Sequence, residues 1–191
     1  MTSKINEMLV ENAKEGDLNE IKKLVEKGAD NFNFALCQSA HFGHFDIIKY
    51  LVENGADIHI NFDFALRRNA YNGRLDIVRY LVEKGADIYA LSDAAFRNSV
   101  QEGHLDVVKY LVEKGVDIHA DNEGALRWSV QEGHLDIVKF LVEKGANVFL
   151  GCDFEKTDTL VEEYLMKICK LKIEAAGYLV NDFVREWLWK P

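Results

Sequence analysis

The sequence predicts an all-α solenoid of about five helix-turn-helix units, followed by a C-terminal helical cap. Three observations carry this prediction. Pairs of glycines recur at a fixed spacing, apolar residues recur at helical intervals, and the sole proline is the last residue. The 191 residues are 48% hydrophobic and 29% charged, which is typical of a folded globular chain and excludes wholesale disorder.

The glycines define the repeat. In four units the first glycine recurs every 30 residues, and a second glycine follows it by twelve. A degenerate unit precedes these four by 27 residues. The pairs are Gly16/Gly28, Gly43/Gly55, Gly73/Gly85, Gly103/Gly115 and Gly133/Gly145. We therefore expect an array over residues 1–150, with units near 1–30, 31–57, 58–87, 88–117 and 118–147.

The first helix of each unit is best seen in the third. We expect it over residues 64–71, because Asp63 is a favourable N-cap and Gly73 suits the left-handed position after the last turn. The equivalent cap residues are Asn33, Asp93 and, in the fifth unit, Asn122 ahead of Glu123.

The second helix of the third unit follows at once. Asp76 lies in its first turn, where negative charge suits the helix dipole, and Gly85 ends it. Between them runs one apolar stripe, which predicts a buried face. The stripe consists of Ile77, Val78, Leu81 and Val82.

Residues 133–147, with the string Gly-His-Leu-Asp-Ile-Val-Lys-Phe-Leu-Val-Glu-Lys-Gly-Ala-Asn, resemble the second half of an ankyrin repeat. The family's Thr-Pro-Leu-His-x-Ala signature survives only in part, for example at Ala65-Leu66-Arg67. The usual ankyrin period is about 33 residues, so the resemblance implies that the family's β-hairpin is shortened to a plain turn. The short period also resembles that of ankyrin proteins from giant DNA viruses. The ankyrin resemblance covers roughly residues 5–150.

The first unit is predicted to be an N-terminal cap. It carries Glu20 and Lys23 at two positions where later units are apolar. Charge at these positions indicates a face with no preceding unit to contact. The apolar equivalents are Ile47, Ile77, Val107 and Ile137, and Tyr50, Tyr80, Tyr110 and Phe140.

After Asn147 the pattern stops, and residues 151–191 are expected to form a helical cap packed on the last repeat. A long helix capped by Thr157-Asp158-Thr159 is predicted to run through Ala176, and Gly177 separates it from a second apolar stripe. The apolar faces are Leu160, Tyr164, Leu165, Ile168, Cys169 and Leu171, then Leu179, Phe183, Val184, Trp187 and Leu188. The alternative is a recruitment module for a second protein, although the signatures of F-box and elongin-binding tails are absent.

Charge and composition exclude several classes. No run of about 18 apolar residues is present, so we expect no membrane contact, and the N-terminal segment lacks a signal-peptide pattern. A net charge of −9 argues against a nucleic-acid partner, because phosphate binding depends on Lys and Arg. Cys37, Cys152 and Cys169 share no short spacing, which favours a reduced cytoplasmic compartment. We expect a monomer.

The titratable residues carry no catalytic or metal-binding pattern. Structural zinc needs four close ligands, and the six histidines show no such spacing. Cys37 replaces an arginine of later units and has no companion base, so it is interpreted as a partly buried side chain. Phosphate loops and nucleophile elbows are absent. We therefore expect no enzyme activity, no cofactor and no metal. The histidines are His44, His104 and His134 at the Gly-His position, His59 and His119 in a loop, and His41.

Function is expected where the units differ on an exposed face, because the shared residues are used for stacking. The ankyrin resemblance implies that the variable first-helix positions line a concave groove together with the turn tips. The open alternative to binding is that Trp128 and Tyr71 fill gaps between first helices. The predicted partner-binding residues are Asn61, Phe62, Arg68, Tyr71, Asn72, Leu91, Asn98, Gln101, Asp121, Asn122, Trp128 and Gln131. The recurring Glu53, Glu83, Glu113 and Glu143 are expected to face water.

Two functions therefore compete. The first is a non-catalytic protein-protein interaction module that binds a partner protein through the concave face. The second is a bridging adaptor, for example for a ubiquitin ligase, whose C-terminal helices recruit a second protein.

Overall fold

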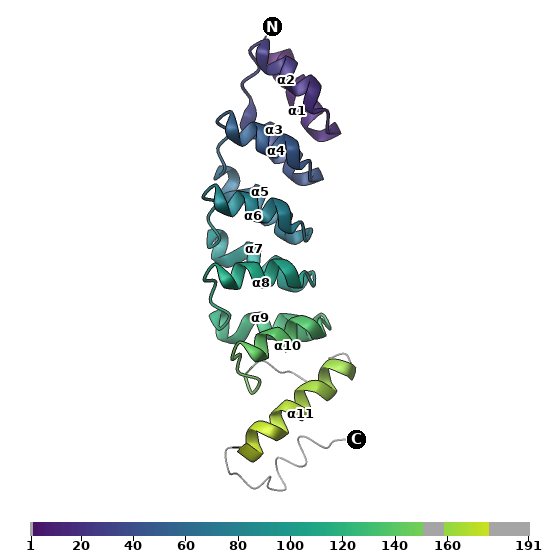
Figure 1. Ribbon diagram of the computed structural model, residues 1–191, viewed down its shortest axis with the longest axis vertical. Coiled ribbons are helices and arrows are strands. Elements are labelled where there is room, and N and C mark those ends of the chain that lie inside the picture. The colour runs from purple at the N-terminus through teal and green to yellow at the C-terminus, as the bar shows by residue number, and fades with distance from the viewer. Residues whose placement is uncertain (1, 151–158, 176–191) are drawn as a thin grey trace. The chain divides into compact units, whose positions relative to one another are not determined.

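The computed structural model describes residues 2–150 and 159–175, and every element within these ranges is a helix. The helices form helix-turn-helix pairs followed by one longer C-terminal helix, which confirms the predicted all-α repeat fold (Figure 1). The chain divides into two compact units, an N-terminal unit of residues 1–116 and a C-terminal unit of residues 117–191. The domain boundary expected at residue 150 stays a prediction.

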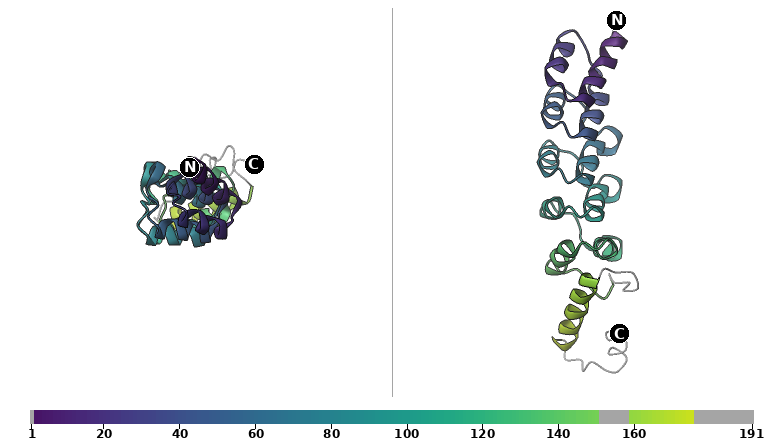
Figure 2. Two further views of the ribbon diagram at one scale, coloured as in Figure 1. Left: turned by 90° about the horizontal axis from the view of Figure 1, so that it is seen from above. Right: turned by 90° about the vertical axis from the view of Figure 1, so that its right-hand side faces the viewer.

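The N-terminal unit is a stack of helix pairs. Its first helices contact one another in sequence order and form one layer, and its second helices form the other layer (Figure 2). We call the outer surfaces of these layers the first-helix face and the second-helix face. The pairs are α1 (Thr2–Glu15) with α2 (Leu18–Glu26), α3 (Phe32–Phe42) with α4 (Phe45–Glu53), α5 (Ile60–Tyr71) with α6 (Leu75–Glu83), and α7 (Ala90–Gln101) with α8 (Leu105–Glu113).

Leucines fill the core of the N-terminal unit. Leu51, Leu81 and Leu111 of the second helices are all 0% exposed, as predicted for Leu81. Leu36 and Leu66 of the first helices are also buried. Full burial of one such side chain contributes about 1.5–3 kcal/mol, so the repeated leucine position is a main source of stability.

The first pair carries charge at two positions where later pairs are apolar, and its role as an N-terminal cap stays a prediction. Lys23 Nζ lies 2.9 Å from Glu20 Oε2, and the Lys23 side chain is 61% exposed. In the following units the aromatic equivalents of Lys23 contact the preceding second helix. Tyr80 packs edge-on against Phe45, with ring centroids 5.6 Å apart, and Tyr110 lies under the Arg79 guanidinium at 4.6 Å. In the first pair the charged Glu20–Lys23 pair stands at these positions instead.

The shortened connection is a left-handed turn rather than a plain one. Asn61, Phe62 and Asp63 have φ values of 52°, 57° and 54°, and right-handed helix resumes at Phe64, where the sequence predicted the helix to begin. The same turn recurs at Leu91-Ser92-Asp93 and Asp121-Asn122-Glu123. Left-handed backbone costs a non-glycine residue about 1–2 kcal/mol, so side-chain contacts must hold each turn.

The predicted N-cap role of Asn33 and Asp63 is wrong. Their side-chain oxygens accept hydrogen bonds from the next loop, from the N–H groups of Asp57 at 2.7 Å and Asp87 at 2.8 Å. Asn33 lies inside α3, two residues after its N-cap position Asn31, and Asp63 lies within the left-handed turn of α5. Glu123 likewise bonds to a loop residue, His119, instead of capping its helix.

The C-terminal unit contains α9 (Ala120–Gln131), α10 (Leu135–Glu143) and α11 (Thr159–Ala175), with α11 in contact with α10. Val161, Leu165 and Cys169 are its fully buried positions, spaced four residues apart. The broader apolar face predicted for this helix is wrong at two places. Leu160 is 62% exposed and Leu171 is 51% exposed, because one helix packed on one neighbour buries only a narrow stripe.

Part of the predicted cap lies outside the described residues. This holds for Thr157 and Asp158 of the expected helix start, for Ala176 and Gly177, and for the second apolar stripe from Leu179 to Leu188. Within the described ranges, no helix is long and apolar enough to cross a membrane.

Candidate partner-binding surface

The predicted binding residues fall into two groups, one in each compact unit. The N-terminal unit holds Asn61, Phe62, Arg68, Tyr71, Asn72, Leu91, Asn98 and Gln101. The C-terminal unit holds Asp121, Asn122, Trp128 and Gln131. They lie on first helices and turn tips, and none of them is classed as buried.

The turn tips of the N-terminal unit expose apolar side chains. Phe62 is 68% exposed and Leu91 is 47% exposed. Arg67 holds the first turn in place, because its Nε donates to the Phe62 carbonyl at 2.8 Å and its Nη2 donates to the Asn61 carbonyl at 2.9 Å. The turn can therefore present Phe62 to a partner in a fixed position.

The same arginine position explains Cys37. In the C-terminal unit Arg127 donates to the carbonyls of Asp121 and Asn122, as Arg67 does in its own turn. The second repeat has Cys37 at this position, and α3 contains no residue with positive φ. Without a left-handed turn, α3 has no turn carbonyls that require an arginine donor. A small side chain such as that of Cys37 is therefore sufficient at this position. Burial raises the pKa of the Cys37 thiol, against a weaker opposing hydrogen bond from Asn61.

Arg68 and Tyr71 form the centre of the first-helix face in α5. The Arg68 guanidinium lies over the Tyr71 ring, 5.4 Å from its centroid, and Tyr71 is 41% exposed. Asn72, half-buried, donates from Nδ2 to the Arg68 carbonyl at 2.7 Å and is thus partly committed to its own helix. In α7, Asn98 is half-buried and Gln101 is exposed.

Phe34 and Phe42 of α3 are exposed aromatic residues outside the predicted set. Phe42 is 44% exposed at the end of α3, and Phe34 is 62% exposed near its start. The sequence contained a signal for Phe42, because the equivalent residues Asn72, Glu102 and Glu132 are polar. An aromatic residue at an otherwise polar surface position indicates a contact that stacking does not require.

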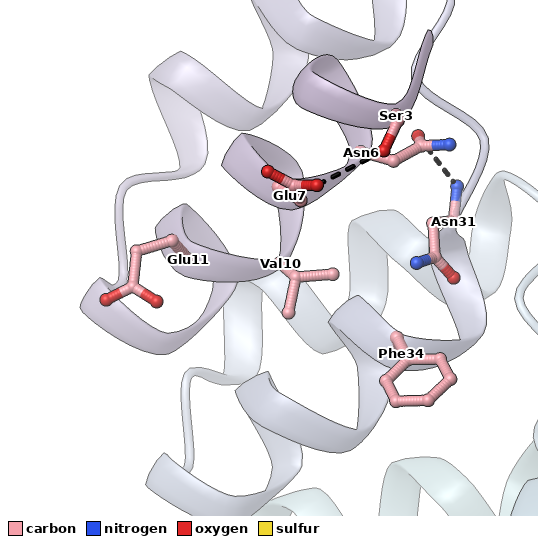
Figure 3. A pocket seen from close by; sticks show the side chains of 7 residues that line it. All are labelled: Ser3, Asn6, Glu7, Val10, Glu11, Asn31 and Phe34. Atoms are coloured by element: carbon pink, nitrogen blue, oxygen red, sulfur yellow. Dashed lines mark hydrogen bonds between the residues drawn. The ribbon is translucent and has the colours of Figure 1, made fainter.

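Phe34 borders a hollow of about 570 Å³ between α1 and α3 (Figure 3). Val10 provides an apolar wall, and Glu7 and Glu11 lie on the side of α1. Asn6 fixes the upper rim, because its Oδ1 accepts from the N–H of Asn31 at 3.2 Å. The hollow is open, and its polar side chains are engaged within the chain by the Ser3–Glu7 hydrogen bond and the Lys14–Glu11 ion pair.

In the C-terminal unit, Trp128 is half-buried and lies against Gly124. A Cβ atom at Gly124 would lie 3.1 Å from Trp128 Cη2, so the indole occupies the space that a side chain would fill. Both residues belong to α9, so this contact lies within one helix, and the choice between a gap-filling and a partner-binding Trp128 stays open. Asp121, Asn122 and Gln131 are exposed.

Two of the histidines at the Gly-His position contact backbone carbonyls. His44 Nε2 lies 2.9 Å from the Lys14 carbonyl and His104 Nε2 lies 2.8 Å from the Tyr71 carbonyl, so each ring contacts the end of the preceding first helix. Gly73 leaves room for this contact, because a Cβ there would lie 2.5 Å from His104 Nδ1. Its φ of 68° also favours glycine.

The loop histidines pair with buried carboxylates. His59 Nδ1 lies 3.1 Å from Asp63 Oδ1, and His119 Nδ1 lies 2.7 Å from Glu123 Oε1. The hydrogen bond to Glu123 raises the pKa of His119. Within residues 2–150 and 159–175, no group of three or more His, Cys, Asp or Glu side chains is placed to hold a metal ion.

The recurring glutamates of the second helices face water, as predicted. Glu53, Glu83 and Glu113 are exposed on the second-helix face of the N-terminal unit, and Glu143 is exposed in the C-terminal unit. Aromatic residues are therefore displayed on first helices and turn tips, while the recurring glutamates lie on second helices.

A protein-family model described as "Ankyrin repeats (3 copies)" matches residues 9–92 and 91–152. No curated protein matches the sequence.

Proposed function

The chain belongs to the ankyrin-repeat family, and from this premise we propose that it grips one partner protein through its first-helix face and turn tips. Ankyrin repeats are generally protein-protein interaction modules and are typically non-catalytic. The proposed binding residues are the twelve variable positions predicted from the sequence, together with Phe42.

The exposure of Phe62 and Tyr71 carries this proposal. Both rings are more than 40% exposed at positions where the other units have different residue types, so repeat stacking does not dictate them. Interface hot spots are enriched in aromatic residues and arginine, and here exposed aromatic residues lie beside an arginine. The second-helix face has recurring glutamates instead, a composition that disfavours the centre of an interface.

The bridging adaptor is the second candidate, and the exposed leucines of α11 favour it. Leu171 and Leu160 are exposed and lie outside the narrow buried stripe of this helix, which contacts α10. A second protein docking on α11 would cover them. Covering one leucine side chain contributes about 1.5–3 kcal/mol.

Origin and compartment belong to the same proposal. The 30-residue period supports a viral ankyrin protein that acts as a monomer in the cytoplasm of a host cell.

Site-specific photo-crosslinking tests which face binds. A benzophenone amino acid is placed at Tyr71, at Glu83 or at Leu171 of the full chain expressed in cells. The proposal predicts that one protein is crosslinked from Tyr71 and not from Glu83. Crosslinking of a different protein from Leu171 supports the adaptor. Crosslinking from Glu83 alone would overturn the assignment of the first-helix face.

A further inference from the structure

We infer that the ends of α3 and α5 form a docking surface for an acidic segment of a protein partner. In this complex Arg68 binds a carboxylate of the segment, and Phe42 and Tyr71 contact an adjacent apolar side chain. The surface, here called the Arg68 patch, consists of His41, Phe42, Arg68, Tyr71 and Arg74. The inference rests on the proposed function and adds to it the chemistry of the partner.

The patch is continuous across two neighbouring repeats. Arg74 begins α6, and its Nη1 donates back to the carbonyls of Ala40 at 3.2 Å and His41 at 3.4 Å in α3. The His41 and Phe42 rings meet edge-on, with centroids 4.9 Å apart. On α5, the Arg68 guanidinium lies over Tyr71 at 5.4 Å. These contacts place both arginines beside the exposed aromatic rings.

Arg68 differs from its neighbouring arginines in having no acceptor. Arg67 donates to two carbonyls of its turn, and Arg74 donates to α3 carbonyls and to Asn69 Oδ1 at 3.2 Å. Arg68 Nε is buried without a hydrogen-bond partner, and the Arg68 side chain forms no ion pair within the described residues. The charge of this guanidinium is therefore not balanced within the described residues, and a carboxylate bound to the accessible part of the half-buried side chain would balance it.

The Arg68 patch also carries an excess of positive charge, which favours a negatively charged partner. Burial lowers the pKa of Arg74, the nearby charge of Arg68 lowers it further, and Asp76 acts in the opposite direction. Arg68 and Arg74 therefore repel each other in a protein whose net charge is −9. A partner carboxylate would offset this repulsion, and the planar guanidinium can bind both of its oxygens.

The aromatic rings favour a protein segment over a phosphate polymer. Phe42 and Tyr71 are 44% and 41% exposed, so together they offer an apolar surface beside the guanidinium. Nucleic acids require neutralisation of many phosphates, and two arginines in an acidic chain supply little of it. An Asp or Glu followed or preceded by an apolar residue fits the patch on both counts.

Peptide selection on the full chain tests the inference. A phage-displayed library of random linear peptides is selected on the wild-type protein, and the selected peptides are synthesised with a fluorophore. Their affinities are measured by fluorescence anisotropy for the wild type, Arg68→Gln, Arg68→Lys and Tyr71→Ala. Lys27→Gln is the matched control, because it removes the same charge from an exposed position outside the patch. Unchanged melting temperatures establish that the variants are folded.

We expect selected peptides that pair Asp or Glu with an apolar residue. Arg68→Gln and Tyr71→Ala should each weaken them by about tenfold or more, Arg68→Lys should restore part of the loss, and Lys27→Gln should leave affinity unchanged. Peptides that depend on Tyr71 but not on Arg68 would overturn the acidic-segment inference and leave the proposed function standing. Peptides that depend on neither residue, or a selection that returns none, would count against both. Arg68-dependent binding of a single-stranded oligonucleotide that displaces the peptides would overturn the choice of a protein segment.

Discussion

The Asp63 carboxylate accepts a hydrogen bond of 2.8 Å from the backbone N–H of Asp87, twenty-four residues further along the chain. The Asp87 carboxylate in turn accepts from the N–H of Tyr89 at 2.9 Å. Asn33 and Asp57 are related in the same way, and so are Asn6 and Asp30. In these three repeats, one side-chain oxygen therefore fastens the start of the first helix to the loop that ends the same unit and leads into the next.

Asp63→Ala should lower the free energy of unfolding by about 1–3 kcal/mol, because Asp63 is buried and its loss removes the acceptor of the Asp87 N–H. Asp63→Asn should lower it less, since Asn33 makes the equivalent bond. Urea denaturation measures both changes. Asp46→Ala, on the exposed start of α4, is the control. Equal effects of Asp63→Ala and Asp46→Ala would show that the hydrogen bond between the Asp87 N–H and the Asp63 carboxylate contributes nothing to stability.

Leu81→Ala should lower the free energy of unfolding by about 2–5 kcal/mol, because Leu81 is 0% exposed between the two helix layers. Leu91→Ala is the matched control at a turn tip, 47% exposed, and should change stability by less than about 0.5 kcal/mol. The same denaturation experiment compares them. A reversed order would contradict the helix register.

The first pair should lose its capping property when its charges are removed. The double variant Glu20→Ile, Lys23→Tyr places the apolar residues of later repeats on a face that no unit covers. We expect concentration-dependent self-association in sedimentation-velocity experiments. If this variant stays monodisperse at the highest soluble concentration, the face is not the outer one.

Stability of the C-terminal unit should depend on pH through His119. The hydrogen bond to Glu123 raises the pKa of His119. The negative charges of Glu123 and Asp117 also raise it, and burial opposes them. The stabilisation is fully present below the unfolded pKa of about 6.5 and is lost as the pH rises through the folded value. Melting temperature should therefore fall across that interval in the wild type and less in His119→Gln. Identical pH profiles would show that the pair does not contribute.

Much of the repeat frame was predictable because it follows from local chemistry. The glycine period and the apolar stripe around Leu81 predicted the helix pairs and their buried faces. The left-handed turn of Phe62 was not predictable, because three successive non-glycine residues carry no sequence signal for positive φ. The partner of Asp63 was missed for the same reason, since the turn decides where its carboxylate points.

The candidate surface was only partly predictable. Variation between units identified Tyr71 and Arg68 as residues outside the stacking frame. It did not show that Arg68 lacks an acceptor while Arg67 has two, because that difference depends on the carbonyls exposed by the turn. Nor did it separate Trp128 from these residues, because the exposure of this side chain depends on how neighbouring helices pack in the folded unit, where it is half-buried.

Binding affinity tests the central proposal most directly. The partner identified by crosslinking is titrated calorimetrically into the wild type and into two double variants. The aromatic variant carries Phe62→Ala and Tyr71→Ala, and the glutamate variant carries Glu83→Gln and Glu113→Gln. Equal melting temperatures of all three proteins are established first. Loss of two exposed aromatic contacts should weaken binding more than tenfold, about 1.4 kcal/mol, while the glutamate variant on the second-helix face binds as the wild type does. Normal binding by the aromatic variant, together with loss of binding by the glutamate variant, would place the working surface on the second helices and contradict the proposal.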